Sequence, residues 1–436
     1  METVEAYLDR KLREAELLNS CLSSPFDLQR PASAAAAIVQ KFRIAAAIKV
    51  EQAMRSWAVT ETARSPAQPA SAGAFEFRYG YQRADLRAYG PEVYPSLCAP
   101  TSPALQQTIY TSSGMSALAA LLTTLSRLNK SVEMLVPRGY YSETRELIES
   151  LGAGISAHPW ESVCGTRRSR GTARILLLDS SVPAAFFSFL RMPVRDIDLV
   201  VFDTTCYWRS SARIRRAARW ALQSGLPVAL VRSHAKLDCL GIEYGRLGSL
   251  VIAVPLEKGP RSIRPWVSDL SAEVRNSVRL FGVAPIPASF PPFWDSPEFE
   301  RSSVARIAAT IRNNRRMARV LSAAPSCAGS VSEFQHGLYV TVMPDDDLSA
   351  PGASKLAAEL CSDLKSAAAP VVHAGSFGFD FVAIEWFSDP VSRRNVLRIA
   401  ASDAPTSCID DVAEGITRAL SGRLSTTGVA SYAMST

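Results

Sequence analysis

A lysine stands where a buried strand is expected to end, and this position favours nucleophilic chemistry. Residues 226–231 form a short apolar run typical of a buried parallel strand, and the chain turns polar at residues 233–236, which end in Lys236. Only eight of the 48 Lys and Arg residues are lysines, so a lysine at this point needs an explanation. A partly desolvated lysine loses its proton more easily and becomes an amine that can form a Schiff base. The alternative is a lysine that simply opens a polar loop.

A second group of residues favours phosphate binding at the start of a helix. Ser112 and Ser113 are typical N-cap residues, and the apolar spacing that follows Gly114 and Met115 is helical. Small residues at a helix start leave backbone N–H groups available, and the helix dipole adds a favourable potential for an anion. A simple capped helix is the alternative.

Two other stretches carry side chains that could contribute to the same chemistry. Asp203 closes the apolar run 197–203, so a carboxylate is expected at the end of a buried strand. Residues 75–84 are rich in aromatic residues and arginine, and there Tyr81 and Arg83 could present a phenol and a guanidinium to an anion. The alternatives are a solvent-facing acid and an ordinary amphipathic strand.

The elements that must position these residues alternate between strand and helix. Apolar, β-rich runs predict strands at 132–137, 173–179, 197–203, 226–231 and 248–255, and helical patterns lie at 142–150 and 211–224. This alternation predicts an α/β fold with a mostly parallel sheet and helices on both faces. In such sheets, functional residues gather at the carboxyl ends of the strands.

The pattern changes on either side of this region, which predicts three parts. Residues 1–74 are expected to form a helical arm followed by a linker, and residues 75–260 the large α/β domain. Residues 261–436 are expected to form a smaller α+β domain with two connecting helices at 269–281 and 296–324. Strands are expected at 337–343, 379–387 and 396–401, with helices at 352–368 and 409–420.

Composition excludes several classes of protein. The 436 residues are 47% hydrophobic and 20% charged, as in ordinary globular proteins, and the net charge of +7 is spread along the chain rather than concentrated as for nucleic acid. The cysteines form no Cys-x-x-Cys pair and the four histidines are scattered, so no metal site is expected. No apolar run reaches membrane-spanning length, and acidic residues stand where the basic region of a signal peptide would be. A cytoplasmic protein without nucleic-acid or membrane partners is expected.

Taken in order, these motifs resemble the fold-type I pyridoxal-phosphate enzymes. The closest resemblance is to the Cys/Met-metabolism group, which includes cystathionine γ-synthase and γ-lyase. The matching motifs are Tyr81-Gln82-Arg83, Ser113-Gly114-Met115, Tyr140 or Tyr141, Asp203 with Thr205, Ser233-His234-Ala235-Lys236, Ser376-Phe377-Gly378 and Arg398. The resemblance covers about residues 75–420, and its specificity lies in the order of the motifs rather than in any one of them.

The resemblance implies pyridoxal 5'-phosphate as cofactor and a small amino acid as substrate. Lys236 would hold the cofactor as a Schiff base and then move protons, while Asp203 would keep the pyridine nitrogen protonated. A tyrosine at 140 or 141 would stack on the ring, and Arg398 with Ser376 would bind the substrate carboxylate. The amides of Gly114 and Met115, with Ser233, would bind the phosphate, and Ser113 and Thr205 would also belong to the cofactor site. Tyr81 and Arg83 of a neighbouring subunit would complete the phosphate site, in a homodimer or homotetramer with shared sites.

The chain also departs from the family pattern. Residues 84–89 replace the usual Asn-Pro-Thr after Tyr-x-Arg, and Ala235 replaces a hydroxyl residue before the lysine. His234, two residues before the lysine, is interpreted either as an ordinary loop histidine or as a catalytic one. These differences suggest a divergent enzyme of specialised metabolism.

The predicted reaction begins with an external aldimine and a Cα carbanion of the substrate. Elimination or replacement at the γ or β carbon is the first interpretation, aminotransfer the second, and retro-aldol cleavage or decarboxylation the third. A non-catalytic regulator on the same fold is the alternative from a different class. Lys236 and Asp203 argue against a regulator, as does the lack of a winged-helix DNA-binding segment.

Overall fold

The computed structural model of this protein forms two compact units. It describes residues 2–60, 70–79, 86–95, 97, 104–163, 169–182, 194–256, 265–324, 331–334, 336–343, 348–389 and 392–430. Unit 1 comprises Met1–Ile48, Leu240–Glu243 and Ser296–Thr436, and unit 2 comprises Lys49–Cys239 and Tyr244–Asp295. This division differs from the expected ranges 1–74, 75–260 and 261–436, because most of the N-terminal arm groups with the C-terminal residues.

Unit 2 is built on a seven-stranded sheet of order β4-β10-β9-β8-β7-β5-β6. Its strands are β4 (Ala104–Thr111), β5 (Ser131–Val136), β6 (Ile155–Pro159), β7 (Thr172–Asp179), β8 (Leu199–Asp203), β9 (Val228–Ser233) and β10 (Gly248–Pro255). Neighbouring strands from β9 to β6 are parallel, whereas β10 runs antiparallel to both β9 and β4. The predicted α/β fold with a mostly parallel sheet is confirmed, and one expected strand runs in the opposite direction.

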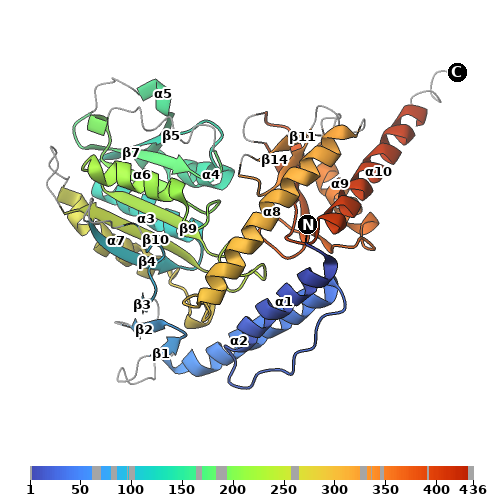
Figure 1. Ribbon diagram of the computed structural model, residues 1–436. Helices are drawn as coiled ribbons and strands as arrows, with labels where there is room; N and C mark the ends of the chain where they lie inside the picture. Colours follow the sequence, from blue (N-terminus) through green and yellow to red (C-terminus); the bar gives the residue numbers. More distant parts are fainter. Residues whose placement is uncertain are drawn as a thin grey trace. The chain divides into compact units, whose positions relative to one another are not determined.

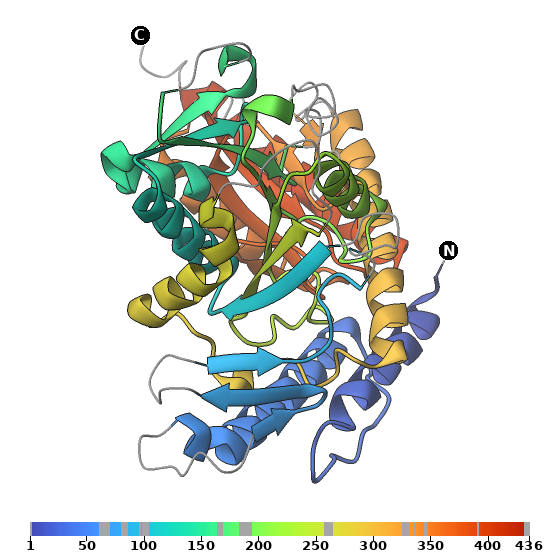
Figure 2. The ribbon, with the colours of Figure 1, turned by 90° about the vertical axis from the view of Figure 1, so that its left-hand side faces the viewer.

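Apolar runs form these strands because both faces of the sheet are covered. Every residue of β7 is buried, as expected for a strand inside a two-sided sheet. Helices α3 (Gly114–Leu128), α4 (Ser142–Ser150) and α7 (Pro265–Phe281) pack on one face in a continuous apolar cluster. Helix α6 (Ala212–Gln223) lies on the other face (Figure 1, Figure 2). Short helices complete the unit at α5 (Trp160–Val163), η1 (Gly152–Gly154), η4 (Val194–Asp196) and η5 (Pro287–Ser289).

A small antiparallel sheet in unit 2 contains β1 (Ala70–Ala72), β2 (Phe75–Tyr79) and β3 (Leu86–Tyr89). Phe75 and Phe77 of β2 are buried, and the ring of Phe75 lies 5.0 Å from that of Phe290 and 5.6 Å from that of Trp294. The first part of the stretch 75–84 is therefore a strand with an aromatic core. Tyr81 and Arg83 lie outside the described residues.

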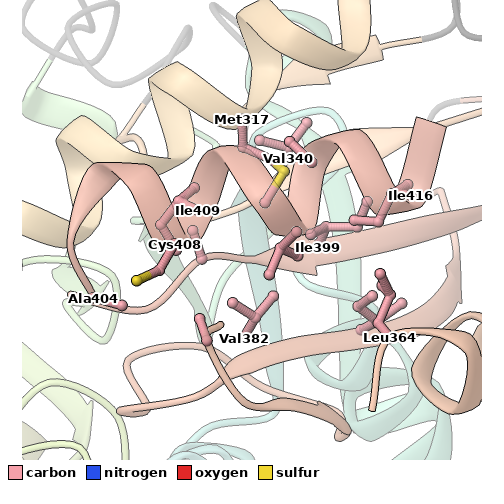
Figure 3. Close-up of a cluster of buried hydrophobic side chains, with 14 of the residues drawn as sticks. Met317, Val340, Leu364, Val382, Ile399, Ala404, Cys408, Ile409 and Ile416 are labelled. Atoms are coloured by element: carbon pink, nitrogen blue, oxygen red, sulfur yellow. The ribbon is translucent and has the colours of Figure 1, made fainter. Parts of the chain in front are cut away.

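Unit 1 contains a five-stranded sheet of order β11-β12-β15-β14-β13. Its strands are β11 (Val331–Glu333), β12 (Val340–Val342), β13 (Val371–His373), β14 (Val382–Ser388) and β15 (Asn395–Ala400), and its helices include α8 (Pro297–Ala323), α9 (Ala350–Asp363) and α10 (Thr406–Ala430). Figure 3 shows Ile409 and Ile416 of α10 facing Val382 and Ile399 of the sheet. The predicted α+β character is confirmed, although β11 and β13 were not predicted.

Helices α1 (Val4–Asn19) and α2 (Ala34–Thr60) were expected to form an arm, and α2 continues from unit 1 into unit 2. Tyr7 and Leu8 of α1 join the apolar core of unit 1. Charged side chains also tie these helices to unit 1, since Lys11 and Lys41, both fully buried, bond to Asp380. No helix among the described residues has the length and apolarity needed to cross a membrane.

Candidate functional site

Polar side chains gather in unit 2 where β7, β8 and β9 end. Asp179 is the last residue of β7 and Asp203 the last residue of β8, and the two are paired in register on adjacent strands. The next strand, β9, ends at Ser233, and a turn over residues 234–237 follows. Because carboxyl ends of parallel strands meet at one edge of a sheet, the local pattern places these residues together.

Asp203 carries a carboxyl group with an unusual proton affinity. Its Oδ1 accepts a hydrogen bond from the backbone N–H of Thr205 at 2.9 Å. Burial, together with the charge of Asp179, raises the pKa of Asp203 to about 6, despite opposing effects from Thr205 and Arg232. An acid in this state is stabilised by a cationic partner, which makes it a candidate for binding one.

Asp179 is a site residue that the sequence analysis did not identify. Its side chain is buried and accepts backbone N–H groups from Tyr141 at 2.8 Å and from Ser181 at 2.7 Å. Burial raises its pKa as well, although these hydrogen bonds lower it. The available signal was the same as for Asp203, an acid that closes a fully apolar run.

Lys236 lies in the turn after β9 and is partly buried. Burial raises the pKa of the neighbouring Cys206 thiol, the charges of Asp203 and Asp179 raise it further, and the positive charge of Lys236 lowers it. One thiol therefore lies within electrostatic reach of the lysine and of both carboxylates. The backbone N–H of Ser233 also donates to Oγ1 of Thr205 at 3.1 Å, which joins the lysine strand to the loop after Asp203.

The N-terminus of α3 packs directly against the end of β9. Ser113 is the N-cap, and its side chain accepts the backbone N–H of Ser116 at 3.0 Å. A Cβ atom at Gly114 would lie 3.0 Å from the backbone nitrogen of Ser233, so glycine permits this close approach. The first N–H groups of the helix, including that of Met115, thus start beside Ser233 in a position suited to an anion.

Tyr140 and Tyr141, either of which was predicted to stack on the cofactor ring, differ in their surroundings. Tyr140 is 6% exposed and belongs to the apolar cluster beneath α3, with the guanidinium of Arg145 5.3 Å from its ring centre. Tyr141 is 37% exposed, and its backbone N–H is bonded to Asp179. Of the two, Tyr141 has the more accessible ring and the direct link to the strand-end acids.

His234 is held in a buried hydrogen-bonded network. Its Nδ1 lies 2.7 Å from Oδ2 of Asp238 and its Nε2 lies 2.8 Å from Oγ of Ser249. Arg232, also buried, bonds to both carboxylate oxygens of Asp238. Burial lowers the pKa of His234, so the ring is neutral and both nitrogens are engaged. This arrangement supports the interpretation of His234 as a structural residue.

The predicted substrate residues belong to unit 1. Arg398 of β15 forms an ion pair with Glu385, its in-register neighbour on β14, and lies 5.4 Å from the ring centres of Tyr339 and Phe387. Ser376 is buried. The structure thus brings the predicted residues of the lysine turn, the acid strand and the helix start together within unit 2. No group of three or more potential metal ligands occurs in the described part of the chain.

Comparison with known proteins gives similarity at the level of structure. No protein-family model matches the sequence, and no curated protein matches it. MetB from Corynebacterium glutamicum has a TM-score of 0.50 and 16% identity, covering 86% of this chain and 98% of its own. A protein described as the O-acetylhomoserine (thiol)-lyase MetY from Campylobacter jejuni, which contains a pyridoxyl-lysine phosphate group, has a TM-score of 0.50 and 15% identity, covering 71% and 81%.

A cystathionine gamma lyase, CalE6 from Micromonospora echinospora, has 17% identity and a TM-score of 0.48, covering 72% of this chain and 82% of its own. At 15–16% identity, the likeness to MetB and MetY concerns architecture alone. The observed seven-stranded, mostly parallel sheet agrees with such an architecture. The chain therefore has the fold of the fold-type I pyridoxal-phosphate enzymes.

Proposed function

We propose that this protein is a pyridoxal-phosphate-dependent enzyme that acts on a small amino acid, by elimination or replacement at the γ or β carbon. The observation that carries the proposal is one constellation at the strand ends of unit 2. It combines Lys236 in the turn after β9, the buried carboxyl groups of Asp179 and Asp203, and the N-terminus of helix α3. The likeness to MetB and MetY supports the same interpretation.

The acid pair fits the pyridine nitrogen of the cofactor. Asp179 and Asp203 are adjacent, and burial and mutual repulsion raise the pKa of Asp203 to about 6. A protonated nitrogen placed against Asp203 would supply the positive charge that lowers this energetic cost. The pair of buried carboxyl groups therefore favours a positively charged ring at this position over a negatively charged group.

The helix start fits the cofactor phosphate. The N–H groups of Gly114 and Met115 and the hydroxyl of Ser233 are the groups that would bind it. Thr205 already accepts the N–H of Ser233, so its proposed role is to hold the strand end in place. Tyr81 and Arg83 are proposed to complete the phosphate site from a neighbouring subunit.

Bound pyridoxal phosphate supplies an electron-accepting ring that stabilises negative charge at the substrate Cα. Lys236 would hold the cofactor covalently and then, as a free amine, take the proton from Cα. Asp203 would hold the proton on the ring nitrogen, and Tyr141 would cover the ring face and exclude water. Arg398 with Ser376 is the proposed partner of the substrate carboxylate.

Covalent attachment provides the direct test. The protein is incubated with pyridoxal phosphate, reduced with borohydride and digested, and the labelled peptide is identified by mass spectrometry. We expect the label on Lys236 and none in the Lys236→Ala variant, because the other described lysines do not follow a buried strand of the α/β sheet. A label on another lysine would reject the site assignment.

The reaction type is decided by product analysis. Elimination from an activated homoserine releases the side-chain leaving group, ammonia and a keto acid, and replacement releases the leaving group and forms a new amino acid. Aminotransfer instead gives pyridoxamine phosphate and a keto acid that keeps the side-chain substituent. We expect release of the leaving group without accumulation of pyridoxamine phosphate. A labelled protein that turns over no amino acid would favour the non-catalytic regulator instead.

A further inference from the structure

Arg232 and Asp238 lie on either side of Lys236 in the sequence and form a buried ion pair. We propose that they are positioning residues, which fix the turn carrying Lys236 relative to the loop that follows Asp203. The inference rests on the proposed function in one respect, that Lys236 is the reactive amine. Its contacts lie within unit 2, in the lysine turn and the segments packed around it.

The ion pair itself is bidentate and enclosed. Nε of Arg232 donates to Oδ2 of Asp238 at 2.6 Å, and Nη2 donates to Oδ1 at 2.7 Å. Arg232 is 0% exposed and Asp238 is 2% exposed. A planar guanidinium that matches both carboxylate oxygens restricts orientation as well as distance, which a lysine at the same place would not do.

The remaining guanidinium nitrogen reaches the acid loop. Nη1 of Arg232 donates to the backbone carbonyl of Thr204 at 3.0 Å and to that of Tyr207 at 2.7 Å. Thr204 directly follows Asp203, and Asp238 stands two residues after Lys236. A single side chain therefore bonds to both segments whose relative position sets the lysine against the acid.

His234 and Trp294 hold the same turn from other directions. His234, two residues before Lys236, lies 2.7 Å from Oδ2 of Asp238, and Nε1 of Trp294 donates to the backbone carbonyl of Asp238 at 2.9 Å. The carboxylate of Asp238 at one end of the turn thus binds His234 at the other end, and Trp294 fixes the backbone at Asp238. A flexible lysine side chain on an immobile turn loses less entropy when it reaches its reacting position, which favours catalysis.

The network also keeps its charge state over the working pH range. Burial alone would raise the pKa of Asp238, but the charge and hydrogen bonds of Arg232, with a contribution from His234, hold that pKa well below its usual range. Burial lowers the pKa of His234, which stays neutral. The nearby group whose pKa burial raises to about 6 is Asp203, and it acts on the thiol of Cys206, as Lys236 does.

The chain offers a matched control for a purely structural role. Arg174 is 2% exposed, lies at the amino end of β7 in the same sheet, and bonds through Nε to Glu133 at 2.6 Å. Arg174→Lys replaces a buried guanidinium group by an ammonium group in β7, just as Arg232→Lys does beside the turn that carries Lys236. A general loss of sheet stability would affect both variants alike.

The experiment compares Arg232→Lys with Arg174→Lys by three readouts. Two use cofactor-free protein: hydrogen exchange of the peptide covering residues 233–240, and the pH dependence of reductive methylation at Lys236. The third is the pH midpoint of the absorbance band of bound pyridoxal phosphate. For Arg232→Lys we expect exchange to rise at least about tenfold and both pH profiles to move by about half a unit or more. Arg174→Lys should change none of the three, at comparable loss of melting temperature.

Equal behaviour of the two variants in these readouts would overturn the inference. If Arg232→Lys fails to fold, the double variant Arg232→Met/Asp238→Leu removes both buried charges together and is measured in its place. Failure of the proposed function is distinguishable, because wild-type protein would then take no label at Lys236 while exchange and methylation still report on the turn.

Discussion

At the scale of single residues, the acid pair is the feature that most needs a partner. Asp179 and Asp203 close adjacent parallel strands, burial raises the pKa of both carboxyl groups, and the charge of Asp179 raises that of Asp203 further. Asp179 also accepts a hydrogen bond from the backbone N–H of Tyr141, which leaves Asp203 as the acid proposed to face the cofactor. Perturbed acids of this kind gather at functional sites.

The raised pKa of Asp203 predicts an unusual dependence of stability on pH. The folded pKa is about 6 and the ordinary value is 3.8, so the folded state binds more protons between these limits. The free energy of unfolding of the cofactor-free protein should therefore fall as pH rises from about 4 to about 6, by up to about 3 kcal/mol from this group. Asp203→Asn should reduce this fall and be the more stable protein at pH 7, as measured by urea unfolding.

A suitable control for this measurement is Asp295→Asn, which changes an exposed aspartate in the same unit. It should leave the pH dependence of unfolding as in wild type. If Asp203→Asn and wild type give parallel curves between pH 4 and pH 7, then Asp203 does not carry the raised pKa.

At the scale of elements, the helix start depends on close packing between backbones. Gly248 of β10 pairs with Thr111 on one side and Ser233 on the other, beneath the start of α3. A Cβ atom at Gly248 would collide with the backbone carbonyl of Ser113 and the nitrogen of Gly114. The position of the helix N-terminus relative to Ser233 is thus set by two glycines.

Gly248→Ala should disturb both the fold and the proposed phosphate site. Displacement of the helix start is expected to cost about 1–3 kcal/mol of stability and to weaken pyridoxal-phosphate binding about tenfold. Thermal unfolding and a fluorescence titration with the cofactor measure the two effects. Gly352→Ala in α9, where the nearest atom would be 3.4 Å away, should leave both nearly unchanged. Unchanged binding in Gly248→Ala would separate the helix start from phosphate recognition.

At the scale of the whole molecule, unit 1 is held together by buried charges as well as by its apolar core. Three fully buried carboxylates surround the ammonium group of Lys11, which bonds to Glu14 at 3.0 Å and to Asp380 and Asp403 at 2.8 Å each. Lys41 and Arg306 balance the remaining negative charge. The cluster joins helix α1 to segments more than 360 residues later in the chain.

Lys11→Met should therefore destabilise the protein strongly. Removing one partner leaves buried carboxylates undercompensated, at an expected cost of about 3–5 kcal/mol in the free energy of unfolding by denaturant. The same substitution at Lys355, whose pair with Glu359 is exposed at a separation of 3.8 Å, should change stability by less than about 1 kcal/mol. Equal effects at the two positions would mean that the cluster contributes nothing specific.

Assembly is the other prediction at this scale. We propose at least a homodimer, because the sequence resemblance implies that Tyr81 and Arg83 complete the proposed phosphate site of a neighbouring subunit. Inactive Arg83→Ala is mixed with inactive Lys236→Ala under conditions that exchange subunits. Shared sites would leave some mixed dimers with one intact site, so activity should return. Confirmed exchange without activity, or a fully active monomer by light scattering, would contradict shared sites.

The sequence by itself determined the elements and their class. Short runs rich in apolar, β-forming residues predicted the buried strands, and the helix expected at 142–150 has the observed bounds of α4. The same local patterns placed Lys236 and Asp203 at strand ends, where a parallel sheet gathers functional residues. Their roles toward the cofactor stay predictions.

Tertiary structure alone decided how distant residues meet. An apolar run does not encode strand direction, so the antiparallel course of β10 followed only from its neighbours. The grouping of the N-terminal helices with unit 1 depends on ion pairs between residues far apart in sequence, which no local pattern reveals. The same reason applies to His234 and Asp179, because Ser249 of β10 and the backbone of Tyr141 come within hydrogen-bonding distance of them only in the folded chain.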